Sequence, residues 1–220
     1  MSVVNQKSRT DLFLNRLEKE ILVLDGAMGS MIFGLGLTEA EVRGERFKAW
    51  PHDLKNCTDV FGLTHPEKIT ELHRQYLEAG ADIIETNTFQ ASLVGLSDFE
   101  FPEEIVREIN FAGVSNARRA ADEYTEKTPD QPRFVAGSIG PTSKQTAIST
   151  KVEDPAYRNT SFEEMEASYF IQVQALVEAG VDILFPETVI DTLNLKACLF
   201  AIARYFEESG NVVPVMVSGT

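Results

Sequence analysis

The chain has 220 residues, of which 43% are hydrophobic and 25% charged, and a formal net charge of −14. These proportions are typical of a folded globular protein and argue against disorder as its main state. The negative charge argues against a nucleic-acid backbone or an anionic membrane as the main partner, because both bind clustered Lys and Arg. The only two cysteines, Cys57 and Cys198, lie far apart and lack a metal-ligand spacing, so a disulfide scaffold is excluded.

The amino-terminal segment predicts a helix followed by a strand. We expect a helical extension over residues 1–20, in which Asp11–Glu20 forms a short helix that could cover the amino-terminal end of a barrel. Ile21–Leu24 is a compact apolar strand that ends in Asp25 and two glycines. This amino-terminal segment has charges throughout and no apolar core of a signal peptide, and no later stretch has the roughly 18 apolar residues of a membrane helix, so we expect a cytoplasmic protein.

The next segment, Leu37–Phe61, has no convincing period, and a connection of this length is typical of a binding loop or lid. Thr64–Glu67 has the spacing of a capping box, which predicts the start of a helix that ends at Gly80. Further helices are expected from Pro102 to about Tyr124, after a second capping box at Ser161–Glu164, and from Asp191 onward. Cys198 shares the apolar stripe of the last of these helices, so we expect it in the core rather than at a metal.

A repeated pattern organises the chain. Ala79–Phe89, AGADIIETNTF, returns as Ala179–Thr188, AGVDILFPET, and each copy predicts a helix end, a glycine turn, a buried strand and a polar strand end. Other strands are predicted at Arg133–Ser138 and Val212–Val217. Repeated helix–strand units with parallel strands form either a (β/α)8 barrel or an open doubly wound sheet, and both bind ligands beyond the carboxyl ends of their strands.

The residues at those strand ends are the candidates for a binding site. They are Asp25, Glu85, Thr86, Asn87, Thr88, Ser138 and Glu187. With carboxylates and no Lys or Arg, such a face favours an amine-bearing ligand over a phosphate. An amino acid fits, with its ammonium paired to Asp25 and Glu187 and its carboxylate bound by hydroxyls and backbone amides. Alternatively, Glu85 and Glu187 merely cap neighbouring helices or pair with cations of the barrel. The scattered histidines have no zinc spacing.

Several long motifs, in this order, identify a family resemblance. They are LDGAMGSMI, GERFKAWPHDLKNCTD, LTHPEKITELHRQYLEAGADIIETNTF, GSIGPTSKQTAIS, DPAYRNTSFEEM and PETVIDTLNLKAC. From Ile21 to Thr220 the chain resembles the homocysteine-binding domain of cobalamin-dependent methionine synthase, and more distantly the betaine– and S-methylmethionine–homocysteine methyltransferases.

The resemblance implies a (β/α)8 barrel, of which residues 21–220 would form about the first five units. It also implies methyl transfer to the thiol of homocysteine to give methionine, with the thiol activated as a zinc-bound thiolate. Asp25 and Glu187 would hold the substrate's amino group, and Thr86 and Ser138 would lie near its carboxylate. Neither cysteine matches the family's three zinc ligands, so the resemblance places these beyond Thr220, together with the cobalamin and folate modules.

Two alternatives to a methionine synthase remain open from the sequence. One is a cobalamin-independent homocysteine S-methyltransferase. The other is a non-catalytic half-barrel that binds an amino acid or a partner chain through an unpaired fifth strand, because an exposed strand edge is prone to pairing. For the same reason we expect the 220-residue chain by itself to be poorly stable.

Overall fold

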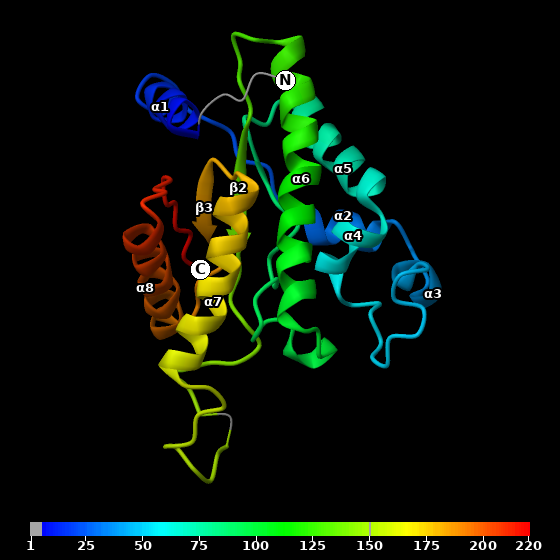
Figure 1. The fold of residues 1–220 in the computed structure, drawn as a ribbon, viewed down its shortest axis with the longest axis vertical. Helices are drawn as coiled ribbons and strands as arrows, with labels where there is room; N and C mark the ends of the chain where they lie inside the picture. Colours follow the sequence, from blue (N-terminus) through cyan, green and yellow to red (C-terminus); the bar gives the residue numbers. More distant parts are fainter. Residues whose placement is uncertain (1–5, 150) are drawn as a thin grey trace.

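The computed structural model describes residues 6–149 and 151–220, and its centre is a parallel sheet of three strands flanked by helices (Figure 1). The strands β1 (Ile83–Glu85), β2 (Phe134–Ile139) and β3 (Ile183–Pro186) lie in chain order. The helices are α1 (Gln6–Leu17), α2 (Met28–Gly34), α3 (Glu39–Arg43), α4 (Phe61–Thr64), α5 (Pro66–Glu78), α6 (Glu103–Lys127), α7 (Phe162–Ala179) and α8 (Thr192–Ser209), with short 3-10 helices η1 (Thr58–Val60) and η2 (Ser97–Phe99). No helix among these residues is long and apolar enough to cross a membrane.

Both edges of the sheet are extended by segments that pair in parallel without forming regular strands. Leu24 bridges to Ile83 beside β1, and Val215 bridges to Leu184 beside β3. The prediction of regular strands at Ile21–Leu24 and Val212–Val217 was therefore wrong, although their places next to β1 and β3 agree with a sheet built in chain order. Each segment lies at an edge of the sheet and pairs with one strand only. Its backbone hydrogen bonds are too few to form a regular strand.

One face of the sheet is covered by helices α6, α7 and α8, which lie side by side with α5 (Figure 1). The strand residues on this face are fully buried in the largest apolar cluster. They are Ile84, Val135, Ile139 and Leu184. Cys198 of α8 is buried in the same cluster, as predicted. This cluster fixes the positions of the strands, and thereby of the residues at their carboxyl ends.

The opposite face carries a smaller apolar cluster. Its strand residues are Ile83, Phe134, Ala136, Ile183 and Phe185. Phe13 of α1 packs edge-on against Phe134, with 5.2 Å between ring centroids. Arg9 and Arg16 of the same helix donate hydrogen bonds to the carbonyls of Arg133 and Pro132, just before β2. Helix α1 thus covers the amino-terminal ends of the strands, where it was predicted, and leaves their carboxyl ends to other residues.

The turns confirm the predicted repeat. Gly80 and Gly180 close their helices with φ of 107° and 96°, a left-handed conformation that costs glycine little. The capping box at Ser161 is present, with Glu164 as its partner. The capping box predicted at Thr64 is wrong, because the Thr64 hydroxyl donates to the carbonyl of Val60 in the preceding helix and His65 is the N-cap.

Segment 37–61 is more regular than its sequence indicated. It contains α3, which starts with a capping box formed by Thr38 and Glu41, and it contributes Val42, Phe47 and Leu54 to an apolar cluster of its own. The cluster includes residues of α5 and α6. The segment is therefore packed on the helical layer along most of its length.

Candidate functional site

The candidate site follows from the two-residue period of the strands. Successive side chains of a strand point to opposite faces, so every second residue continues the same face. On the face that carries Phe134 and Phe185, the next positions toward the carboxyl ends are Glu85, Ser138 and Glu187. The strand pairing holds them together, since Glu85 lies opposite Ala136 and Ser138 lies opposite Phe185.

The three predicted carboxylates lie close together at the strand ends. Oδ1 of Asp25 accepts a bond of 2.9 Å from the backbone N–H of Glu85. The Ser138 hydroxyl donates to Oε1 of Glu187, and the charge of Glu187 acts on the carboxyl groups of Asp25 and Glu85. Oδ2 of Asp25 is buried and has no partner within the described part of the chain. The structure therefore brings together Asp25, Ser138 and Glu187, which the resemblance assigns to the substrate, with Glu85, which the sequence placed among the strand-end candidates without such a role.

Burial and the mutual repulsion of the carboxylates raise the pKa of each acid in this cluster. Burial, with the nearby charge of Glu187, raises the pKa of Asp25 to about 7. Burial, with the charges of Glu187 and Asp25, raises the pKa of Glu85 to about 9. Burial also raises the pKa of Glu187. Among residues 6–149 and 151–220, no Lys, Arg or His forms an ion pair with any of the three. The site lacks a cation, and a ligand ammonium would supply one.

Thr86 lies next to the cluster, but protein groups engage its hydroxyl. The hydroxyl accepts a bond of 3.0 Å from the backbone N–H of Ser138 and lies 2.6 Å from the hydroxyl of Thr88. Thr88 in turn donates to the carbonyl of Ser138. Both threonines are buried. In this arrangement the Thr86 hydroxyl binds the backbone at the end of β2. Its contact with a ligand carboxylate stays a prediction.

Segment 37–61 supports the loop that follows β1, a role that the sequence did not reveal. Oδ1 of Asp59 accepts a bond of 2.9 Å from the backbone N–H of Gln90. Nδ2 of Asn87 donates to the carbonyl of Thr58 at 2.8 Å. Asp59 is buried, and burial raises its pKa to about 6. The only sequence signal was the position of Asp59 at the end of the motif NCTD.

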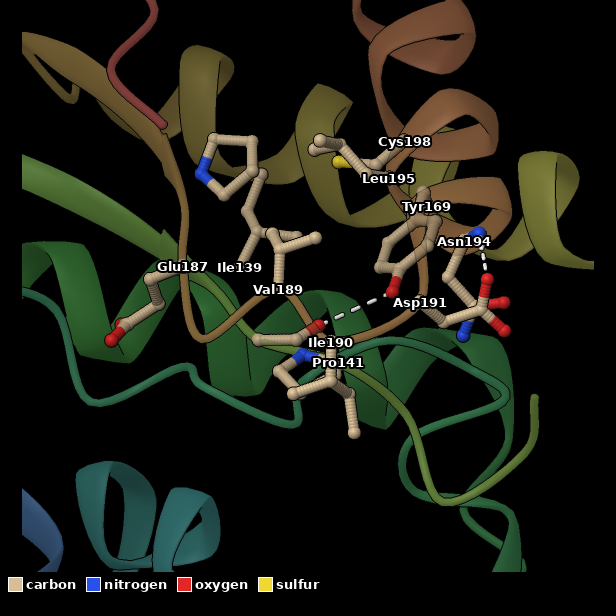
Figure 2. Close-up of a pocket in the computed structure, with 12 residues that line it drawn as sticks. Ile139, Pro141, Tyr169, Glu187, Val189, Ile190, Asp191, Asn194, Leu195 and Cys198 are labelled. Atoms are coloured by element: carbon tan, nitrogen blue, oxygen red, sulfur yellow. Dashed lines mark hydrogen bonds between the residues drawn. The ribbon is translucent and has the colours of Figure 1, made fainter. Parts of the chain in front are cut away.

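A small cavity behind the loop after β3 shares Glu187 with this cluster (Figure 2). Its volume of about 20 Å³ has room for roughly one water molecule, which is too little for an amino acid. Tyr169 and Cys198 line it, and the Tyr169 hydroxyl donates to the carbonyl of Gly140. The Glu187 carboxylate points away from these two side chains (Figure 2). The cavity is therefore a packing gap at the back of the site.

The described residues do not fit a zinc ion. No group of three or more His, Cys, Asp or Glu side chains within residues 6–149 and 151–220 is placed to hold a metal. Cys57 and Cys198 are buried in different apolar clusters, and burial raises the pKa of each thiol, which disfavours the thiolate that zinc binds.

Comparisons with known proteins show the family of the chain. The family model described as homocysteine S-methyltransferase matches residues 22–220. Among solved structures, the chain resembles the homocysteine methyltransferase MmuM from Escherichia coli. Its metallated form is 26% identical, with a TM-score of 0.65 over 86% of this chain and 61% of that one. Its oxidized form is 25% identical, with a TM-score of 0.67 over 92% of this chain and 63% of that one. The chain thus spans less than two thirds of these relatives. From the match over 22–220, the chain belongs to the homocysteine S-methyltransferase family.

Proposed function

We propose that this chain is the homocysteine-binding part of a methyltransferase of the methionine synthase type, which in its complete form transfers a methyl group to the thiol of homocysteine and yields methionine. The observation that carries the proposal is the cluster of Asp25, Glu85 and Glu187 beside Ser138, with no protein cation paired to it in the described residues. The family match and the long motifs support the choice of homocysteine as the ligand.

In this proposal the chain's own residues bind and orient the amino-acid end of the substrate. The ammonium lies between the carboxylates of Asp25 and Glu187, where charge-assisted hydrogen bonds are about twice as strong as neutral ones. Oδ2 of Asp25, which is buried and has no partner among the described residues, gains one. The Ser138 hydroxyl, which donates to Glu187 in this structure, turns toward the substrate carboxylate on the side lined by Thr86.

The proposed architecture is a (β/α)8 barrel with residues 1–20 as a helical extension and 21–220 as part of the barrel. Five segments in parallel and in chain order support it, from Leu24 at one edge to Val215 at the other. The position of the acids supports it too, because barrels bind ligands at the carboxyl ends of their strands. We propose a cytoplasmic location for the enzyme.

Thiol activation and the methyl donor belong to the complete enzyme. A free thiol with a pKa of about 8.5 is mostly protonated at neutral pH, and zinc coordination supplies the thiolate. One structure of MmuM is described as its metallated form, which supports the use of a metal in the family. The described residues of this chain do not form that site, so we assign them no part of the step. We propose methylcobalamin as the methyl donor, because the motifs of this chain resemble those of cobalamin-dependent methionine synthase.

A cobalamin-independent transferase is the second candidate, favoured by the similarity to MmuM, which is described as a homocysteine methyltransferase. Comparing methionine formation from methylcobalamin with that from S-methylmethionine or betaine, in the complete enzyme, distinguishes the two candidates.

Isothermal titration calorimetry on the 220-residue chain tests the binding proposal. We expect L-homocysteine to bind more tightly than 4-mercaptobutyrate, which lacks the ammonium. Glu187→Gln should weaken homocysteine binding by about 10- to 100-fold, the effect of losing a hydrogen bond to a charged group. Glu163→Gln, on the exposed side of α7, is the matched control and should leave binding unchanged. Equal binding of both ligands, or no effect of Glu187→Gln, would contradict the proposal.

A further inference from the structure

The backbone pairing between β1 and β2 stops just before the residue that carries the site's hydroxyl. The N–H of Thr86 donates to the carbonyl of Ala136 at 2.9 Å. Every second residue of a parallel strand bonds to the same neighbour, so the next groups on this side of β2 are the N–H and the carbonyl of Ser138. In a continued ladder they would pair with the carbonyl of Thr86 and the N–H of Thr88.

Those two backbone groups bond to each other instead. The N–H of Thr88 donates to the carbonyl of Thr86 at 2.9 Å, in a tight turn that leads the chain away from the sheet. The hydroxyls of the same residues take their place. Oγ1 of Thr86 accepts from the N–H of Ser138 at 3.0 Å, and Oγ1 of Thr88 donates to the carbonyl of Ser138 at 2.8 Å. Side chains thus continue the ladder beyond the end of β1.

The direction of the bond between the two hydroxyls follows from their hydrogens. The oxygens lie 2.6 Å apart, and each hydroxyl has a single hydrogen to donate. Thr88 uses its hydrogen on the carbonyl of Ser138, because a carbonyl can only accept. Thr86 therefore donates to Thr88, and no hydrogen of Thr86 is left for a ligand.

We propose that the hydroxyls of Thr86 and Thr88 are positioning groups, which form a closed relay from the N–H to the carbonyl of Ser138 and fix this residue for ligand binding. Fixed in this way, the Ser138 hydroxyl reaches Glu187 in the empty site and the ligand carboxylate in the occupied one. Thr86 then lies near that carboxylate without donating to it. This inference rests on the proposed function, in which Ser138 binds the amino-acid end of the ligand.

Neighbouring helices enclose the relay. Gln172 of α7 donates to the carbonyls of Thr88 and Ser138, at 2.8 and 3.4 Å. Cγ2 of Thr88 packs on Gly113 of α6 so closely that a Cβ at Gly113 would lie 2.5 Å from it. Thr88 and Ser138 are 0% and 2% exposed, so water does not compete for their hydrogen bonds. Valine in place of Thr88 keeps the methyl group against Gly113 and removes only the hydroxyl.

Isothermal titration calorimetry with L-homocysteine tests the relay. We expect Thr88→Val to weaken binding by about fivefold to tenfold, and by no more than Ser138→Ala does, the effect of one disturbed hydrogen bond. Thr88→Ser keeps the hydroxyl and should stay within about twofold of the wild type. Thermal melts check that each variant folds. No loss of affinity in Thr88→Val, or an equal loss in Thr88→Ser, would overturn the proposal.

A double-mutant cycle separates positioning from direct contact at Thr86. If Thr86 acts through Ser138, Thr86→Val should weaken homocysteine binding about as much as Thr88→Val, but by less than about twofold when Ser138→Ala is already present. Additive losses in the double variant would mean that Thr86 donates to the ligand itself, contrary to the proposal.

Amide hydrogen exchange, followed by NMR, tests the relay without a ligand. Thr86→Val removes the acceptor of the Ser138 N–H, which should then exchange about tenfold faster. The N–H of Phe134, bonded to the carbonyl of Asp82 at 2.9 Å, is the internal control for unfolding as a whole. Unchanged exchange at Ser138 relative to Phe134 would contradict the relay. If the wild type fails to bind homocysteine, the proposed function fails, and this exchange still decides whether the relay exists.

Discussion

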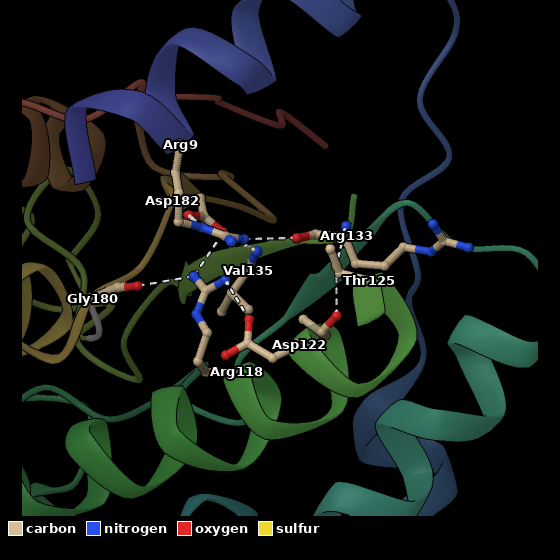
Figure 3. Close-up of polar contacts among 9 residues, drawn as sticks. Arg9, Arg118, Asp122, Thr125, Arg133, Val135, Gly180 and Asp182 are labelled. Carbon is tan, nitrogen blue, oxygen red and sulfur yellow. Dashed lines mark hydrogen bonds and ion pairs between the residues drawn. The ribbon is translucent and has the colours of Figure 1, made fainter. Parts of the chain in front are cut away.

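Asp182 shows how one residue of the repeat connects three parts of the chain (Figure 3). Its side chain is 1% exposed and accepts hydrogen bonds from Arg9 of α1 at 2.6 Å, from Arg118 of α6 at 2.7 Å and from the backbone N–H of Val135 at 2.8 Å. Burial would raise the pKa of Asp182, but the two arginines and the backbone bond outweigh it and lower the pKa. Asp82, at the same place in the other repeat, is less buried and binds Arg16 at 3.1 Å.

We predict that Asp182→Asn lowers the free energy of unfolding by about 3 kcal/mol at pH 7, because it leaves two arginines near a buried site without their partner charge. Asp82→Asn, the matched variant, should cost about 1 kcal/mol or less. Since the folded pKa of Asp182 is lowered, its stabilisation is present above the unfolded pKa of about 3.9 and is lost as the pH falls. Urea unfolding at pH 7 and at about pH 3 measures both effects. An equal cost for the two variants, independent of pH, would contradict this account.

At the scale of elements, α1 shows that the apolar residues of a helix do not by themselves reveal which side of it is buried. The sequence predicted a helix over Asp11–Glu20 that covers one end of the sheet; its four apolar residues are Leu12, Phe13, Leu14 and Leu17. The structure has a helix at that end of the sheet, but over Gln6–Leu17, so it begins and ends earlier than predicted. Only Phe13 of the four is buried, because it lies between Arg9 and Arg16 on one side of the helix. Leu14 is 44% exposed. Spacing along the helix, together with the strand ends it meets, decides which apolar residue packs.

Helix α1 gives a prediction about packing. Phe13→Ala should lower the free energy of unfolding by about 3 kcal/mol, because it removes an aromatic ring that is 4% exposed and packed on Phe134. Leu14→Ala, one residue on, should cost less than about 1 kcal/mol, since much of that side chain already contacts water. Urea midpoints of the two variants give the comparison. Similar shifts in both would mean that α1 does not dock as the structure shows.

At the scale of the whole molecule, the sheet has two edges with apolar side chains in water. At one edge Ile21 is 92% and Val23 is 53% exposed, and at the other Val215 is 39% and Val217 is 46% exposed. Edge strands of this kind offer unpaired backbone groups and apolar side chains to other chains. In the proposed barrel, further strands would cover both edges.

We therefore expect the 220-residue chain to self-associate as its concentration rises, and Val217→Lys to reduce that association by placing a charge on the edge. Val152→Lys is the control, because Val152 is 96% exposed in a loop away from the sheet. Sedimentation velocity over a range of concentrations measures the effect. A monomer at all concentrations, or an equal effect of both lysines, would contradict the role of the edge.

The sequence alone determined the repeat, the parallel direction of its strands and the candidate residues at their ends, because these depend on local chemistry. A glycine that closes a helix, a short apolar run and a polar residue two positions beyond it place Glu187 at a strand end without any tertiary information. The tertiary structure decided what depends on contacts between distant segments. Thr64 faces the preceding helix instead of capping the next one, and Asp59 supports the loop after β1. Glu85, Ser138 and Glu187 share one face only because β2 lies between β1 and β3 in register with both. The protonation of the two acids follows from burial, and burial is a property of the assembled fold.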